Sequence, residues 1–260
     1  MNENRDASEL RASDKSIPTL VEGANGGSEI VNMWKDYFKG TLNSENSANG
    51  SAESVEPSID CKENCLGLQM PMCSFVSLAS LHQKLTLNKV PGPNCVSAEH
   101  LLYADGSMRF FPSELFNMCI VHGYISNSCL NTTIVPRCKN KNGNLSDTSN
   151  YRPVAVATVV SKLLEHFILS NIFSFLNTTD NQFRFKAGHS TDQCTFLLKL
   201  TASYFVTHGS TVPAVFLDAS KAFDGVLHMK LFEKLIQRKV PMCFVRLLKQ
   251  WYKEQTMQIK

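Results

Sequence analysis

Hydrophobic residues recur three and four positions apart along much of the chain, which is the spacing of residues on one face of an α-helix. This spacing is found near residues 30–38, 74–88, 96–103, 113–124, 158–177, 191–205, 228–237 and 242–252. It extends furthest at 158–177, and Thr191 is a suitable N-cap for the helix predicted over 191–205. The pattern predicts a chain that is mainly helical.

Three shorter stretches favour β-strands. "TTIVPRCKNKNGN" (132–144) begins with β-branched residues and ends in a basic turn. "VPAVFLD" (212–218) is short and apolar, and it predicts a buried strand that ends on Asp218. "TMQIK" (256–260) begins a further strand. Helices combined with these strands predict an α+β or α/β architecture.

Changes in composition divide the chain into four parts. Residues 1–28 and 42–64 are rich in Ser, Asn, Gly and Glu and contain few large apolar residues, so we expect flexible segments there. We therefore expect a disordered segment at 1–28, a short amphipathic helix and flexible linker over 29–64, a helical region over 65–130 and the main domain over 131–260.

Other features of the sequence favour an intracellular protein, in the cytoplasm or the nucleus. No stretch approaches the roughly 20 apolar residues that cross a bilayer, so no membrane contact is expected. The start, "MNENRDASEL", is polar and acidic and does not resemble a secretory signal. The nine cysteines are scattered and form no C-x-x-C pair, which indicates reduced, mostly buried thiols.

The charges are unevenly distributed. Residues 1–131 carry 9 Lys and Arg against 15 Asp and Glu, a net charge of −6, whereas residues 132–260 carry 17 against 8, a net charge of +9. A basic half suits a polyanionic partner, and it also suits a face that is merely solvated.

The stretch "VFLDASKAFDG" (215–225) places a carboxylate directly after an apolar run. Asp218 could cap a turn through its side chain. For an isolated stretch of this kind the turn is favoured, and the other interpretation is that Asp218 holds a hard divalent cation such as Mg²⁺, which prefers carboxylate and phosphate oxygens. The pattern alone leaves both interpretations open.

This stretch resembles motif A of reverse transcriptases, in the "F-x-D-x-x-x-A-F-D" form of LINE-type (non-long-terminal-repeat) retrotransposons. The resemblance implies that Asp218 is catalytic and binds Mg²⁺, with help from the backbone carbonyl of Ala219. It implies that Phe223 lies under the sugar of the incoming nucleotide, where the ring excludes a 2′-hydroxyl, and that Asp224 is structural. Gly225 and Leu227 depart from the family pattern.

Upstream stretches resemble further segments of the same family, in the same order. "SNYRPVAVATVVSKLLEHFI" (149–168) is similar to a fingers segment, which implies that Arg152 lies near the nucleotide or template and that Lys162 and Glu165 orient the helix. "IVPRCKNKNGN" resembles the fingers turn that directs Lys139 and Lys141 toward phosphates. Taken alone, Arg152 could form a surface salt bridge and the basic turn could be plain solvent-facing surface.

Two more segments match with substitutions. "NQFRFKAGHSTDQC" (181–194) resembles the "Q-x-G-F-R-x-G-x-S-T" segment that supports the template, which implies template contacts for Gln182 and Lys186. Arg184 replaces its usual glycine, and we expect strain if that position needs a positive φ. "KVPGPNCVSAEHL" resembles "K-A-P-G-P-D-G-I", with Asn94 and Cys95 in place of Asp and Gly.

The resemblance implies an α+β fold: reverse-transcriptase fingers and a partial palm of a right-hand polymerase, with an incomplete palm sheet and residues 65–130 as an N-terminal helical extension. The partners implied are an RNA template, a DNA primer and deoxynucleoside triphosphates. "LLYADGS" (101–107) is close to the Y-x-D-D signature of motif C, but it precedes motif A and is expected in a helix end and turn.

Activity is expected to be lacking in the chain as printed, because motif B and the Y-x-D-D hairpin do not occur before Lys260. Transfer by two metal ions needs several converging carboxylates, and motif A supplies one dependable ligand. We also expect exposed apolar faces and low stability in the C-terminal half. The alternatives are a non-catalytic nucleic-acid-binding remnant or module that uses the basic fingers region, and an interaction module with no nucleic-acid role.

Overall fold

The computed structural model describes residues 20–21, 23–25, 27–42, 72–186, 188–219, 222–223 and 225–260. Asp224 lies outside these residues, as do most of the segments expected to be flexible, at 1–28 and 42–64. Among the described helices, none has both the length and the apolar character that a membrane crossing requires.

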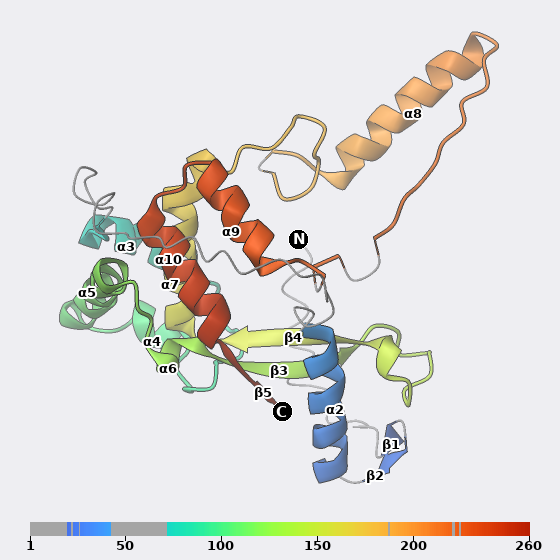
Figure 1. The fold of residues 1–260 in the computed structure, drawn as a ribbon. Helices are drawn as coiled ribbons and strands as arrows, with labels where there is room; N and C mark the ends of the chain where they lie inside the picture. The colour runs from blue at the N-terminus through green and yellow to red at the C-terminus, as the bar shows by residue number, and fades with distance from the viewer. Residues whose placement is uncertain are drawn as a thin grey trace, which may run out of the picture.

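A three-stranded mixed sheet joins distant parts of the sequence (Figure 1). Its central strand, β3 (Asn131–Cys138), pairs antiparallel with β4 (Tyr151–Ala157) and parallel with β5 (Thr256–Ile259). A short 3₁₀ helix, η2 (Thr148–Asn150), precedes β4. The strands predicted in "TTIVPRC" and "TMQIK" are confirmed, and the combination of this sheet with helices is the mixed architecture predicted.

The strand predicted over 212–218 is wrong. These residues form no strand, and Val215, Phe216 and Leu217 are 83%, 81% and 94% exposed. The physical reason is that these residues have no partner strand, because the described sheet consists of β4, β3 and β5 and none of the three pairs with them. An extended segment without a partner strand makes no ladder of hydrogen bonds. The exposure of these apolar residues agrees with the exposed apolar faces expected in the C-terminal half.

The predicted helical stretches all contain helices. The helices are α2 (Gly27–Leu42), α3 (Phe75–His82), α4 (Ala98–Leu102), α5 (Gly106–His122), α6 (Asn127–Leu130), α7 (Val159–Ile172) with η3 (Phe173–Phe175), α8 (Thr191–Thr207), α9 (His228–Gln237) and α10 (Met242–Glu254). The N-cap of α8 is Ser190 rather than Thr191, because the Ser190 hydroxyl accepts the Gln193 N–H at 3.2 Å and the Gln193 side chain accepts the Ser190 N–H in return.

The main hydrophobic core lies between α3, α5, α7, α9 and α10. Phe116, Phe167 and Phe244 are buried at its centre, and the Phe167 ring centroid lies 6.1 Å from that of Phe116 and 6.2 Å from that of Phe244. Gln250 of α10 accepts the Ile125 N–H at 2.6 Å, which fixes α10 beside the turn before α6. The core therefore brings α7 together with helices from the end of the chain.

A smaller core lies between α2 and the sheet. Trp34 and Phe38 of α2 are buried with Ile134 of β3 and Tyr151 of β4, and the Trp34 and Tyr151 ring centroids are 4.9 Å apart. The short strands β1 (Leu20–Val21) and β2 (Ala24–Asn25) contribute Val21. The amphipathic helix predicted near 30–38 is thus packed against the sheet (Figure 1).

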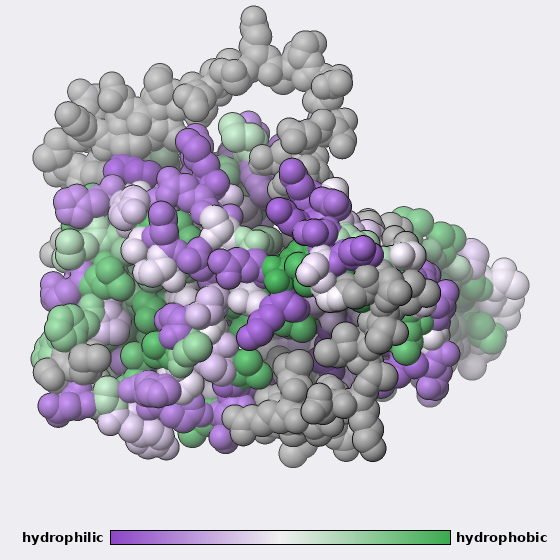
Figure 2. All heavy atoms as spheres, turned by 90° about the horizontal axis from the view of Figure 1, so that it is seen from below, coloured by the Kyte–Doolittle hydropathy of each residue, from purple (hydrophilic) through white to green (hydrophobic). Residues whose placement is uncertain are grey.

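The segment between α7 and α9 contrasts with this packing. Helix α8 projects from the body of the molecule (Figure 1), and none of its residues is buried. Phe196, Leu200 and Tyr204 are 62%, 51% and 60% exposed. Figure 2, viewed from below, shows hydrophobic surface on the lobe that extends to the right.

The loop before α4 makes a tight turn against the β4–α7 junction. A Cβ on Gly92 would lie 2.6 Å from the Ala157 carbonyl oxygen, so only glycine fits there. The Cys95 N–H donates to the Gly92 carbonyl at 3.0 Å, and Cys95 has a φ of 58°, in the left-handed region. Cys95, which replaces a glycine of the resembling segment, therefore adopts a conformation that glycine adopts without strain.

We predict that Cys95→Gly stabilises the chain by about 0.5–1 kcal/mol. Relief of the left-handed conformation contributes about 1–2 kcal/mol, and the greater freedom of glycine in the unfolded chain offsets about 0.5–1 kcal/mol. Urea denaturation followed by tryptophan fluorescence measures the change. Gly92→Ala is the matched control and should destabilise by about 1–3 kcal/mol through its clash with Ala157. A lower midpoint for Cys95→Gly would contradict the prediction.

The carboxylate of Glu99 holds the same loop. It accepts the backbone N–H of Asn88, and this hydrogen bond is the main reason that the pKa of Glu99 is lowered from 4.5 to about 2. The side chain of Ser97 lowers the pKa further. A carboxyl group whose folded pKa is depressed stabilises the fold above its unfolded pKa, and this contribution is lost as the pH falls through the folded value.

We predict that Glu99→Gln flattens the acid limb of the stability profile. In the unaltered chain, the contribution of Glu99 to the free energy of unfolding declines between about pH 4.5 and about pH 2. The variant lacks this titration. The difference in free energy of unfolding between the two chains should therefore be largest near neutral pH and should vanish as the pH falls. Urea midpoints of both chains, measured from neutral pH down to about pH 2, test this prediction. A difference in midpoint that stays constant with pH would refute it.

Candidate functional site

The β3–β4 hairpin carries the predicted phosphate-binding cations. Arg152 on β4 lies opposite Arg137 on β3 in the strand register, and Lys139 and Lys141 follow in the connecting turn. Arg152, Lys139 and Lys141 are all exposed. Like charges directly opposite on paired strands repel one another, so an anion bound between them would be stabilising. The structure brings these cations together on one hairpin.

Lys139 also has a structural part in this turn. Its Nζ donates to the Ser149 carbonyl oxygen at 2.7 Å, and its backbone N–H donates to the Asn150 carbonyl oxygen at 2.7 Å. The Asn150 side chain accepts the Asn140 N–H at 3.0 Å and donates to the Asn140 and Asn144 carbonyls. The ammonium of Lys139 is therefore engaged in closing the turn, whereas the side chain of Lys141 is exposed beyond it.

The carboxylate of Asp147 stabilises the same turn through hydrogen bonds with Ser149. Its carboxylate accepts the Ser149 side-chain hydroxyl and the Ser149 backbone N–H, at 2.7 and 2.8 Å. These bonds are the main cause of a lowered pKa for Asp147, and the charge of Lys139 adds to the effect. The turn thus holds its own acidic group ionised while it presents cations to solvent.

A second group of predicted residues lies in the loop between η3 and α8. Gln182 donates through Nε2 to the Arg184 carbonyl at 2.9 Å, and Lys186 forms an ion pair with Asp180 at 2.9 Å. The Lys186 side chain, by its hydrogen bond and then its charge, lowers the pKa of Asp180. Both predicted template-binding side chains therefore bond within their own loop.

The strain expected at Arg184 lies at its neighbour. Phe185 has a φ of 59°, in the left-handed region, and Arg184 has no positive φ. The Arg184 guanidinium lies 5.9 Å from the centre of the Phe185 ring. Both side chains are exposed. The sequence pattern located the strained loop but assigned the strain to the wrong residue.

The motif A stretch lies on the exposed segment between α8 and α9. Asp218 and Ala219 are exposed, and no hydrogen bond or ion pair links Asp218 to another residue in the part of the chain that the structure describes. Phe223 is 77% exposed, and its ring meets Phe185 edge to face with the centroids 5.8 Å apart. This ring contact joins two of the predicted site segments.

The donor set for a metal ion is incomplete within the described residues. They contain no group of three or more His, Cys, Asp or Glu side chains placed to hold an ion. A divalent cation needs several oxygen ligands, and Asp218 with the Ala219 carbonyl supplies too few. The described residues by themselves therefore do not fit a magnesium site.

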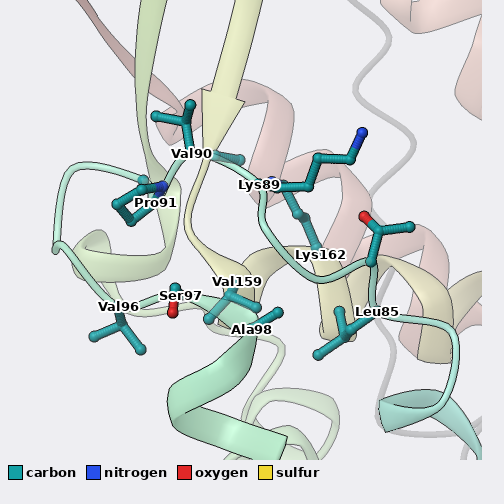
Figure 3. Close-up of a pocket in the computed structure, with 12 residues that line it drawn as sticks. Leu85, Lys89, Val90, Pro91, Val96, Ser97, Ala98, Val159 and Lys162 are labelled. Carbon is teal, nitrogen blue, oxygen red and sulfur yellow. The ribbon is translucent and has the colours of Figure 1, made fainter. Parts of the chain in front are cut away.

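A pocket lies between the loop before α4 and the start of α7, and neither Asp218 nor Ala219 lines it (Figure 3). It is a small pocket of about 40 Å³, partly open to solvent, between the loop that contains Lys89 and Pro91 and the start of α7. Lys162 of α7 reaches toward this loop, whereas Lys89 points away from the pocket. Burial lowers the pKa of Lys162, the Lys89 charge adds to this, and Glu165 opposes it.

Two features of the site were missed from the sequence. The register that places Arg137 opposite Arg152 depends on hairpin pairing, which no pattern in the sequence specified. The contact between Phe185 and Phe223 joins residues that lie on either side of α8 in the sequence. Both phenylalanines belong to segments that the sequence analysis matched to the family. The sequence could therefore single out the two segments, but it gave no signal that the two rings touch.

Comparison with known proteins identifies the second half of the chain. Residues 139–260 match the family model described as "Reverse transcriptase (RNA-dependent DNA polymerase)". The chain is 25% identical over 209 residues to the probable RNA-directed DNA polymerase from transposon X-element of Drosophila melanogaster, a match that covers 77% of this chain and 23% of that protein.

Two other relatives have similar names. The RNA-directed DNA polymerase from mobile element jockey of Drosophila melanogaster is 24% identical over 75% of this chain and 21% of its own length. The probable RNA-directed DNA polymerase from transposon BS of the same species is 27% identical over 43% of this chain and 13% of its own length. The chain spans less than a quarter of the length of each of these curated relatives.

The order of the matched segments, the family model and the relatives agree with one another. The recognition made from the sequence is therefore confirmed: residues 139–260 match the reverse transcriptase family, and the relatives are RNA-directed DNA polymerases of mobile elements, which is consistent with a reverse transcriptase domain of the LINE type.

Proposed function

We propose that this chain is part of an RNA-directed DNA polymerase of a LINE-type retrotransposon and that it contributes nucleic-acid binding rather than complete catalysis. The observation that carries the proposal is the family match over 139–260, which includes the basic turn and the stretch around Asp218. The β3–β4 hairpin and α7 would belong to the fingers, and the stretch around Asp218 to a partial palm. Residues 65–130 would form the N-terminal extension.

The substrates of this proposal are an RNA template, a DNA primer and deoxynucleoside triphosphates. The exposed cations of the β3–β4 hairpin support this proposal. Arg152 lies opposite Arg137 in the strand register, and Lys141 lies in the turn that connects the two strands. Such groups contact phosphates without reading sequence, so binding should be weakly sequence-dependent and sensitive to salt.

Reverse transcriptases generally use divalent metal ions, whose positive charge would balance the negative charge that develops during phosphoryl transfer. In this chain, Asp218 is the residue whose carboxylate would contribute to holding such ions, with Ala219 assisting through its carbonyl. The described residues offer no converging second and third carboxylate. A non-catalytic nucleic-acid-binding module is the alternative function, and the exposed cations of the β3–β4 hairpin support it.

We predict that the chain retains single-stranded RNA at about 50 mM salt and loses most of it by about 200 mM. The double variant Lys141→Ala, Arg152→Ala should weaken binding and reduce the slope of log affinity against log salt by about 0.7 for each phosphate that is no longer neutralised. Fluorescence anisotropy of a labelled oligonucleotide measures both.

Lys230→Ala with Lys234→Ala is the control for this experiment, because it removes the same charge from exposed positions on α9. It should leave the salt slope near that of the unaltered chain. Equal effects of the two double variants would show a general charge effect, and the hairpin would lose its assigned role.

We predict no nucleotide incorporation by the chain alone in a primer-extension assay with an RNA template, a DNA primer and Mg²⁺. One exposed carboxylate balances too little of the charge that develops during phosphoryl transfer. Incorporation that disappears in Asp218→Ala would overturn this prediction. Incorporation that persists in Asp218→Ala would indicate a contaminating polymerase, so the variant also serves as the control.

A further inference from the structure

We propose that the small pocket between the loop before α4 and the start of α7 is a modification site, in which the side-chain amine of Lys162 reacts with carbon dioxide and becomes a carbamate. The inference goes beyond the proposed function and does not depend on it. The residues that the resemblance implies in template or nucleotide contact are not among those that line this pocket.

The size of the pocket limits the ligand that it can take. Its volume is about 40 Å³, far below the roughly 300–1,000 Å³ of sites that enclose a drug-sized molecule. There is too little room for a nucleotide or a sugar. The pocket suits a ligand not much larger than water, whose share of the liquid volume is about 30 Å³. Carbon dioxide is a ligand of this size.

The walls of the pocket favour an uncharged ligand. Val90, Pro91, Val96, Ala98 and Val159 line it, and no acidic side chain is among the described residues that do. Transfer of an ion from water to apolar surroundings is costly unless the ion is paired. Carbon dioxide has no net charge and no hydrogen-bond donor, so it enters such a pocket more readily than bicarbonate does.

Lys162 brings an amine to this pocket. Its side chain reaches from α7 toward the loop that contains Lys89 and Pro91 (Figure 3). Lys162 is half-buried, and within the described part of the chain its Nζ forms no hydrogen bond and no ion pair. An ammonium group that is partly removed from water without such bonds is destabilised relative to the neutral amine.

The electrostatics of the pocket make this amine a nucleophile. Burial lowers the pKa of Lys162, the carboxylate of Glu165 opposes this, and the charge of Lys89 adds to it. The neutral amine carries the lone pair that attacks carbon, and desolvation in an apolar pocket is a recognised way to activate a lysine.

The reaction balances without an oxidant or a reductant. The Nζ lone pair forms a bond to the carbon of carbon dioxide, one carbon–oxygen π bond breaks, and its electrons remain on the oxygen. One N–H proton passes to solvent, and the product is a carbamate anion. The positive charge of Lys89 would stabilise this anion, and the negative charge of Glu165 would oppose it.

The test uses the full chain, equilibrated at mildly alkaline pH with isotopically labelled bicarbonate, which supplies dissolved carbon dioxide. A trialkyloxonium reagent converts any carbamate to a stable ester, and mass spectrometry of tryptic peptides locates the label. The label should be found on Lys162 in excess over Lys84, which is exposed and does not line this pocket.

Two arginine variants identify the reacting group. Lys162→Arg keeps the positive charge and should lose the label of this site, whereas Lys84→Arg is the matched control and should retain it. The α-amino group of the chain also forms carbamates, and its label should persist in both variants. Equal labelling of Lys84 and Lys162 would show ordinary surface chemistry and overturn the proposal, as would a Lys162 without label.

Two further variants keep Lys162 and change only the charges that act on it. Glu165→Gln removes the opposing carboxylate and should raise the labelled fraction of Lys162 by about twofold, and Lys89→Gln removes the assisting cation and should lower it by about twofold. Circular dichroism checks that each variant is folded. Unchanged labelling in both folded variants would overturn the proposal. RNA binding plays no part in this test, so the proposed function and this inference fail separately.

Discussion

The fold depends on how the two edges of β3 are used. The β4 strand reaches one edge through a local hairpin, and β5 reaches the other from the far end of the sequence. The parallel pairing with β5 requires α10 to end beside β3, and Gln250 and Gln255 fix this position by bonding to Ile125 and Thr132. The apolar stretch that contains Phe216 pairs with none of these three strands.

This use of β3 separates a packed part of the molecule from an exposed part. Helices α7, α9 and α10 share one core, so the chain leaves that core after α7 and returns to it at α9. The described residues between them, including α8, the loop of Phe185 and the segment of Asp218, are carried outside (Figure 1). The residues implied in nucleotide chemistry therefore stand on the least buried stretch of the described chain, while the basic hairpin stands on the sheet.

The sequence predicted the helices well, because their hydrophobic spacing reflects burial that the structure provides. It failed at 212–218, where an apolar run indicates a strand but cannot supply the partner that makes one. In the site, the pattern located Lys141, Arg152 and Phe223 in matched segments. It could not foresee that Lys139 closes its own turn, or that Phe185 takes the left-handed conformation, since both follow from distances between backbone groups that only the folded chain defines.

The exposed position of α8 has a consequence for how this region changes over time. A substitution inside the core shared by Phe116, Phe167 and Phe244 is opposed by poorer packing, whatever the protein does. A substitution in α8 disturbs no buried side chain, so folding alone places little constraint on it. Its sequence is then preserved only by whatever the helix touches when the protein works, and without such a contact it is free to drift.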